Sequence, residues 1–361
     1  MIASTVFNQD VCPGSAVALQ SNMFTRLPPL PRDGLNGRTS RASGNRLHRS
    51  WRTRSIVAIT LLLASAVAAQ AQTAGHGPAA PILGWLPTST RALAMGDAAV
   101  ASSDPEAVFY NPAGLMQARG VEVGVQRYGR GATMGSMAVA IPFAPGGLGI
   151  GVQLLDYGAY CTDCDDAVVS REGALAGARG AFPASAMAAS IGFGRTLFGV
   201  RVGATARYIE QRIPSARDGA IAADIGASRR VGPIDVALAV QQLGGRLELA
   251  GKRWELPRRA TVGAQFDRLP AGPFDIAGSA ALSLLAGGDV TVGGGVEIGY
   301  TPLDGYTIAG RAGLRSVPAG DVGPLSLGLA LVRDRIQLEY AFQPLPGPDD
   351  LHRVGLRLHA R

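Results

Sequence analysis

Residues 198–209 read FGVRVGATARYI, and their side chains alternate between apolar and small or polar. In an extended chain, successive side chains point to opposite faces. One face would carry Phe198, Val200, Val202, Ala204, Ala206 and Tyr208, and the other Gly199, Arg201, Gly203, Thr205 and Arg207. This period of two predicts a β-strand with one apolar face.

The same alternation recurs from residue 121 to the end of the chain. It predicts strands at 121–127, 134–142, 147–155, 185–194, 198–209, 219–228, 234–243, 259–267, 274–283, 290–300, 306–316, 324–332, 336–343 and 352–359. An even number of strands of about ten residues each is typical of tilted strands that cross an outer membrane. The prediction is an all-β fold, a 14-stranded antiparallel transmembrane β-barrel over residues 119–361.

Connection lengths support this interpretation, because every second connection is short. The short ones are 143–146, 195–197, 229–233, 268–273, 301–305 and 333–335, whereas 156–184, 210–218 and 244–258 are longer. Outer-membrane barrels combine short periplasmic turns with longer external loops.

The two faces of such a barrel would meet different surroundings. The apolar face would contact outer-membrane lipid, where only a closed barrel satisfies every backbone amide. The other face would line the lumen with the charges of Arg201, Arg207, Glu297, Arg311 and Glu339, and its glycines would leave room for a filling segment. A thin interfacial belt is expected from aromatics at strand ends, namely Tyr128, Tyr208, Tyr300, Tyr306, Tyr340 and Phe342.

An export signal precedes this region. Four arginines in 46–54 are followed by an apolar run at 55–69 and by Ala69-Gln70-Ala71. These three parts predict a secretory signal peptide at 55–71, cleaved near Ala71. The alternative is a membrane anchor, but a run of 15 residues is shorter than a spanning helix needs. Residues 1–54 are interpreted as the signal's basic flank behind an upstream extension from a misassigned start codon.

Composition argues against several function classes. The net charge is +7, but residues 1–71 hold eight arginines and two aspartates, so the rest carries 7 − 6 = +1. A near-neutral body argues against a nucleic-acid partner. After the signal, histidine occurs only at 76, 352 and 359, so no nucleophile–base pair is visible. We expect no catalytic site and no cofactor.

Cys161-Thr-Asp-Cys164 lies in the longest predicted external loop. A zinc site needs about four ligands, and no second Cys or His pair is present. In an oxidising compartment we expect a disulfide between Cys161 and Cys164, with free thiols or a cation site as the alternatives. No metal site is predicted.

Residues 78–118 do not follow the strand pattern. Ala92, Met95 and Ala99 recur at helical spacing, and Asp104-Pro105 is typical of a helix start with Asp104 as the N-cap. Asn111-Pro112-Ala113-Gly114 is typical of a turn. This compact segment would fill the barrel as a plug, and the alternative is a periplasmic extension.

The plug segment also carries a recognisable motif. Arg91-Ala-Leu-Ala-Met-Gly96, Ala98, Ala101, Asp104 and Tyr110-Asn-Pro-Ala-Gly-Leu115 resemble the N-terminal signature of the PorV/PorQ family within the FadL-like outer-membrane barrels. The resemblance implies a plugged fourteen-stranded barrel whose motif residues here are Arg91, Gly96, Asp104, Asn111, Pro112 and Gly114. This chain departs from the pattern at Asp97 and in its last residues, His-Ala-Arg, where an aromatic is usual.

The resemblance implies two functions at the outer membrane of a Gram-negative cell. One is transport of hydrophobic small molecules, and the other is protein secretion with secretion-system partners. A secreted soluble β-rich binding or structural protein is the alternative from a different class. It would stay in solution without detergent.

Overall fold

A computed structural model describes residues 82–128, 131–161, 181–213, 216–249, 251–316, 324–345 and 350–360. The predicted signal peptide, its cleavage site and the upstream extension lie outside the described residues. So do Cys164 and the side chain of Cys161, and the predicted disulfide stays a prediction.

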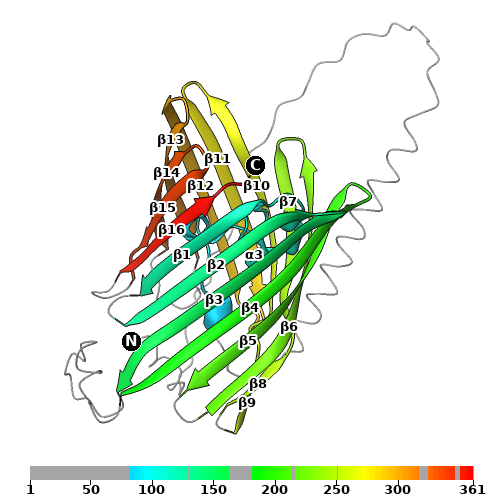
Figure 1. Cartoon of the computed structure of the whole chain (residues 1–361), viewed down its shortest axis with the longest axis vertical. Helices are drawn as coiled ribbons and strands as arrows, with labels where there is room; N and C mark the ends of the chain where they lie inside the picture. The colour runs from blue at the N-terminus through cyan, green and yellow to red at the C-terminus, as the bar shows by residue number, and fades with distance from the viewer. Residues whose placement is uncertain are drawn as a thin grey trace, which may run out of the picture. The chain divides into compact units, whose positions relative to one another are not determined.

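Fourteen strands form a closed antiparallel barrel, which confirms the predicted fold class (Figure 1). They are β1 (Gly120–Tyr128), β2 (Ala132–Phe143), β3 (Gly146–Cys161), β4 (Ala181–Leu197), β5 (Val200–Ile213), β6 (Ala216–Val231), β7 (Ile234–Gly244), β10 (Arg259–Ala271), β11 (Phe274–Leu285), β12 (Val290–Leu303), β13 (Tyr306–Arg315), β14 (Leu325–Arg333), β15 (Ile336–Gln343) and β16 (Leu351–Leu358).

The barrel closes between its first and last strands. β1 pairs with β16 from Val121 opposite Leu358 to Tyr128 opposite Leu351. Each other strand pairs with its neighbours in the chain, except that β7 pairs directly with β10. The intervening residues form a separate hairpin of β8 (Arg246–Leu249) and β9 (Lys252–Glu255), within a connection where the sequence predicted only a loop.

The outer face is apolar, as the alternation predicted. On β14, Leu325, Leu327, Leu329 and Leu331 are 41–54% exposed, whereas Ser326 and Ala330 between them are each 1% exposed. Large exposed apolar side chains also follow the outer faces of the other barrel strands, for example Val125, Ile150, Ile191 and Leu338. A water-soluble barrel would bury these side chains, so this surface is arranged for an apolar surrounding.

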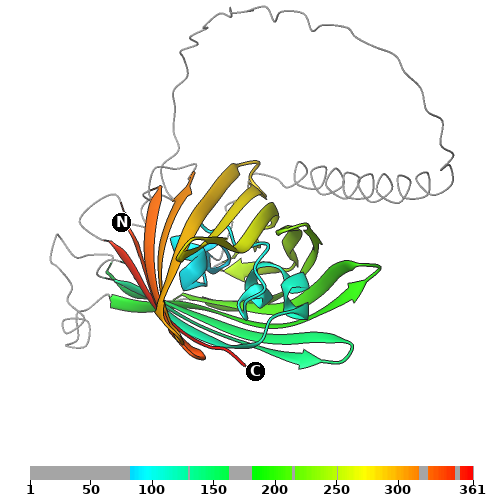
Figure 2. The same cartoon turned by 90° about the horizontal axis from the view of Figure 1, so that it is seen from above.

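In the described part of the chain, from residue 82 on, four short helical segments precede β1: η1 (Ile82–Trp85), α2 (Thr90–Ala94), α3 (Ala107–Tyr110) and η2 (Pro112–Met116). Figure 2 shows them on the inner side of the strands. Within the described residues, no helix is long and apolar enough to cross a bilayer. The buried core is therefore the contact between residues 82–118, which we call the plug, and the inner face of the barrel.

Candidate functional site: the plugged lumen

The first half of the plug rests on glycines of β12, β13, β14 and β16. A Cβ added at Gly295 would lie 2.7 Å from the Met95 Cα, and one at Gly313 would lie 2.3 Å from the Gly96 nitrogen. Both distances are shorter than real Cβ contacts, so only glycine allows the wall and the plug backbone to approach this closely. Gly96 itself has φ +67°, a conformation that suits glycine.

The second half of the plug uses the opposite wall in the same way. An added Cβ at Gly147 of β3 would lie 1.8 Å from the Leu115 carbonyl oxygen, and one at Gly203 of β5 would lie 2.3 Å from the Pro112 carbonyl carbon. The lumenal glycines that the sequence placed on the inner face therefore form two cradles for η2 and α2. They bring the backbones together where larger side chains would hold them apart.

Asn111 joins the two halves of the plug. Its Nδ2 donates to the Val100 carbonyl at 2.7 Å, and its Oδ1 accepts from the Ala113 amide at 3.0 Å. It is the N-cap of η2 with Pro112 in the first turn, and its side chain is fully buried. Gly114 lies close to the Ser102 backbone: an added Cβ at Gly114 would be only 2.3 Å from the Ser102 carbonyl oxygen. The Asn-Pro-Ala-Gly motif thus fixes the plug's own fold.

Arg357 of β16 is the centre of a buried charge cluster. Its guanidinium lies 2.9 Å from Asp104 Oδ1, 3.0 Å from Glu106 Oε1 and 2.8 Å from Glu122 Oε2. Two of these carboxylates belong to the plug and one belongs to β1. Glu106 Oε1 also accepts from the N-cap hydroxyl of Ser89 at 2.7 Å, which connects the cluster to α2.

Arg91 of the plug extends this cluster toward β12. Its Nε donates to Glu297 Oε2 at 3.2 Å, and its Nη1 lies 3.9 Å from Asp104 Oδ2. Arg311 of β13 then bridges Glu297 and Glu339, each at 2.5 Å. The motif residues Arg91 and Asp104 and the lumen charges Glu297, Arg311 and Glu339 are therefore in one connected network between the plug and the wall.

A second group of polar side chains holds the plug near a bulge between β6 and β7. The register shifts between Ala223 and Ile225, and Asp224 Oδ1 accepts from the Gln242 amide at 2.7 Å where the strand ladder is interrupted. Arg207 lies 2.8 Å from Asp224. Arg207 and Gln241 both donate to the Phe109 carbonyl of the plug, at 3.1 and 2.5 Å.

Arg201 of β5 forms a smaller group near the β6–β7 turn. Its Nη2 lies 2.5 Å from Asp235, which also binds Arg230, and its Nη1 donates to Gln117 at the end of the plug. Asp97, the position where this chain departs from the family pattern, lies 3.5 Å from Arg259 and 3.4 Å from Arg315. Its charge therefore has partners on the wall.

Arg353 has no role in the sequence-based predictions. It is completely buried, and its hydrogen bonds go to neutral groups: Thr90 Oγ1 and Gln126 Oε1 at 3.2 Å, Ser136 Oγ at 2.6 Å, and the Thr88 carbonyl. No carboxylate of the described residues lies within ion-pair distance of it. Arg353 and Arg357 of the wall and Glu106 of the plug are residues of the plug–wall contact that the motif alone did not reveal.

The predicted N-cap role of Asp104 is wrong. The helix that follows is a single turn, Ala107–Tyr110, whose N-cap is Glu106 without a side-chain hydrogen bond. Asp104 instead faces Arg357 and Arg91, because two buried guanidiniums attract a carboxylate more strongly than backbone amides do. Burial opposes the charged form, but these arginines outweigh it and lower the pKa of Asp104 from 3.8 to about 2.

The predicted place of Tyr128 in an outer aromatic belt is also wrong, because its side chain is 8% exposed and points inward. Tyr300, Tyr306 and Tyr340 do lie on the outer face. Tyr128 is the last residue of the inner row of β1, and the sheet's alternation fixes its direction whatever its chemistry.

A small cavity lies beside the plug. Its volume is about 10 Å³, enough for one water molecule, and it is lined by Arg91, Met95, Ser102, Glu106 and Ser279 among others. Among the described residues, no group of three or more His, Cys, Asp or Glu side chains is arranged to hold a metal ion.

Comparison by sequence gives no match to a family model or to a curated protein. Comparison by structure is informative: the toluene transporter TodX of Pseudomonas putida matches with a TM-score of 0.50 at 11% identity, over 74% of this chain and 96% of that one. This neighbour is a FadL-like outer-membrane barrel, and what the two proteins share is the fold.

Two further neighbours have related names. A TodX monoaromatic hydrocarbon channel deltaS2 mutant matches with a TM-score of 0.51 at 11% identity, over 78% of this chain and 100% of that one. A FadL homologue of Pseudomonas aeruginosa matches with a TM-score of 0.44 at 11% identity, over 76% and 99%. At these identities the likeness concerns the fold alone.

Proposed function

We propose that this protein is an outer-membrane channel for hydrophobic small molecules, of the chemical kind represented by toluene, and that the plug is its gate. The observation that carries the proposal is the combination of an apolar outer face with a lumen closed by a segment that hydrogen bonds and ion pairs attach to the wall. The FadL-like fold, shared with a toluene transporter, and the predicted export signal support it.

The contacts between plug and wall suggest how a path would form. Polar anchors hold the plug at Arg357, Arg207 and Arg353, whereas an apolar seam joins it to β2. In this seam Val108, Phe109 and Leu115 of the plug cluster with Ala138 and Ala140. Displacing the plug would expose apolar surface along the seam, where a hydrocarbon loses no hydrogen bonds.

An engineered disulfide tests the gate. An added Cβ at Gly355 would lie 3.1 Å from the Thr90 Cβ, so Thr90→Cys with Gly355→Cys places two cysteines close to the spacing that a disulfide needs. Oxidised, this variant should abolish toluene uptake by cells that lack other hydrocarbon channels, and reduction should restore it. The two single-cysteine variants are the controls. Equal uptake by the oxidised and reduced double variant would contradict a moving plug.

A role in protein secretion is the second candidate, and the attachment of the plug to the wall favours it. A barrel that carries cargo at the membrane surface needs no solute path, and ion pairs and hydrogen bonds such as Arg357–Asp104 and Arg207–Phe109 hold the plug in place. The same motif resemblance to the PorV/PorQ family supports this role. Deleting the gene should then deplete specific proteins from the culture medium. An unchanged set of secreted proteins together with lost hydrocarbon uptake would eliminate it.

A further inference from the structure

Three arginines at the short-turn end of the barrel differ from those inside it. Arg195, Arg229 and Arg333 are exposed and lie at or within two residues of the ends of β4, β6 and β14, where short turns begin. Their neighbours along each strand show their direction. An added Cβ at Gly194, Gly226 or Gly328 would meet the plug, so the arginines, at odd separations from these glycines, point outward.

These outward arginines have no carboxylate partner among the described residues, in contrast to the lumenal Arg201, Arg207, Arg311 and Arg357. Asp304 and Asp334 lie at turn tips on the same end, but no ion pair joins them to the three arginines. Three guanidiniums thus lie at the edge of the apolar outer face, and no carboxylate of the described residues neutralises their charge. A guanidinium at that boundary matches the geometry of a phosphate.

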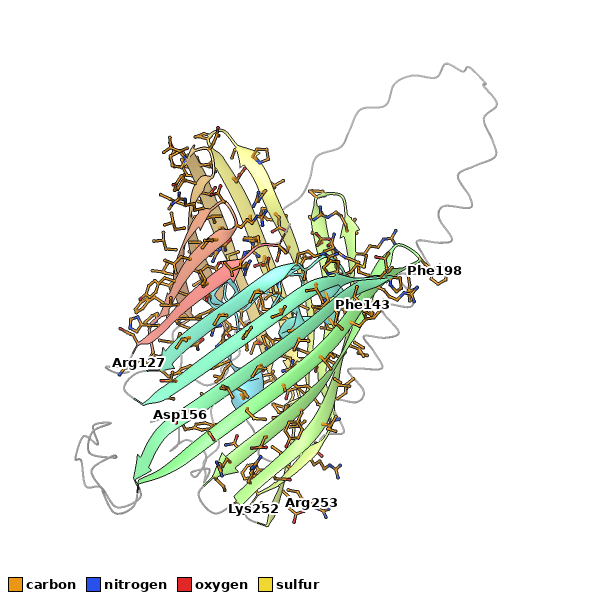
Figure 3. The ribbon with its side chains drawn as sticks, in the orientation of Figure 1. Arg127, Phe143, Asp156, Phe198, Lys252 and Arg253 are labelled. Carbon is orange, nitrogen blue, oxygen red and sulfur yellow. The ribbon has the colours of Figure 1, made fainter. Side chains whose placement is uncertain are left out.

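Aromatic side chains lie at the same level. Phe143 is 54% exposed at the end of β2, and Phe274 is 44% exposed at the start of β11. Phe274 contacts Tyr300 with ring centroids 5.5 Å apart, and the Arg333 guanidinium lies 5.2 Å from the Tyr306 ring centroid. Figure 3 shows Phe143 and Phe198 at this end of the strands and Arg127, Lys252 and Arg253 at the other. Aromatic rings are favoured at the depth of lipid headgroups.

We infer that Arg195, Arg229 and Arg333, with Phe143, Phe274 and Tyr306, form a collar that binds the phosphates of anionic phospholipids. The collar rests on the proposed membrane function, which places the short-turn end on the periplasmic side, next to the phospholipid leaflet. Each arginine would hold one headgroup phosphate, and the rings would lie beside the glycerol and upper acyl groups. The partner is thus a phospholipid of net negative charge.

The experiment measures lipids retained by the whole barrel. The folded protein is reconstituted in vesicles of phosphatidylcholine and phosphatidylglycerol, extracted gently, and its bound lipids are counted by native mass spectrometry. A basic residue near an anionic surface is expected to enrich the anionic lipid about fivefold. Arg195→Gln, Arg229→Gln and Arg333→Gln together should remove most of the phosphatidylglycerol preference, and high salt should weaken it in the wild type.

A charge-matched control comes from the hairpin at the opposite end. Arg246→Gln, Lys252→Gln and Arg253→Gln remove three exposed basic charges from β8 and β9 and should leave the preference unchanged. Arg195→Lys, Arg229→Lys and Arg333→Lys keep the charge and should retain part of it, which protects the test if the glutamine variant misfolds. Equal phosphatidylglycerol retention by wild type and the glutamine collar variant would overturn the collar. A chain that never enters vesicles would contradict the proposed function instead.

Discussion

The Arg357 guanidinium lies 2.9 Å from Asp104 Oδ1, and this contact joins the last strand of the barrel to the segment that precedes the first. Around it, Glu106 and Glu122 approach the same guanidinium. One arginine therefore connects both strands of the closing seam to the plug. Since the Arg357 side chain is 3% exposed, water contributes little to neutralising these carboxylates.

Removing this arginine should release the plug before it opens the barrel. Arg357→Gln leaves Asp104, Glu106 and Glu122 without their shared counter-charge, which we expect to cost about 3–5 kcal/mol of stability. Protease cleavage within residues 82–118 measures the release of the plug. The temperature at which the gel migration of the protein changes measures the opening of the barrel. Lys252→Gln, in the exposed β8–β9 hairpin, is the control. Adding Asp104→Asn should recover part of the loss, and strictly additive losses would argue against direct coupling.

The glycine cradles predict a sharp positional effect. Gly203→Val would place a Cβ 2.3 Å from the Pro112 carbonyl carbon, so the plug must move away from the wall. Gly135→Val on β2 is the matched control, because nothing lies within 4 Å of its added Cβ. We expect protease-sensitive plugs in the first variant and wild-type behaviour in the second. Similar behaviour of the two would show that the close approach is unimportant.

Acid should weaken the attachment of the plug through Asp104. The pKa of this carboxyl falls from 3.8 to about 2 in the folded protein, so its contribution is complete above about pH 4 and is lost as the pH falls toward 2. Denaturant unfolding at pH 4 and at pH 2 should show a larger stability loss for wild type than for Asp104→Asn. An identical loss in both would mean that other carboxylates account for the acid sensitivity.

A charge on the outer face should prevent membrane insertion. Leu329 lies in the middle of β14 and is 54% exposed, and Leu329→Arg should cost about 2–4 kcal/mol of folding stability in a bilayer. The control is Phe198→Arg, because Phe198 is fully exposed at a turn. Val332→Arg is less suitable, because Val332 lies on the inner face. Refolding yield into vesicles measures the effect. A soluble barrel would tolerate or benefit from both substitutions.

The strands were predictable because each carries its own evidence. Alternation is local, so β5 and β12 could be recognised without knowing their neighbours, and all fourteen predicted segments overlap barrel strands. The β8–β9 hairpin was missed, because Arg246–Leu249 and Lys252–Glu255 are each four residues long, too short for a period to be visible.

The site was less predictable, because its contacts join distant parts of the chain. Asp104 followed by Pro105 has the local pattern of a helix start, and nothing nearby indicates that Arg357 lies opposite. Likewise, Glu106 has no local motif, although it bonds both Ser89 and Arg357. The inner face could be listed from alternation, but which of its charges meet the plug depends on the register and closure of the whole barrel.

The central claim is that the outer face contacts acyl chains while the inner face holds the plug, and lipid quenching along β14 tests it most directly. A single tryptophan would be placed in turn at residues 326, 327, 329, 330 and 331 of a barrel whose native tryptophans are replaced, in vesicles with brominated acyl chains. The account predicts strong quenching at Leu327, Leu329 and Leu331 and little at Ser326 and Ala330. Uniform quenching, or none at any position, would contradict it.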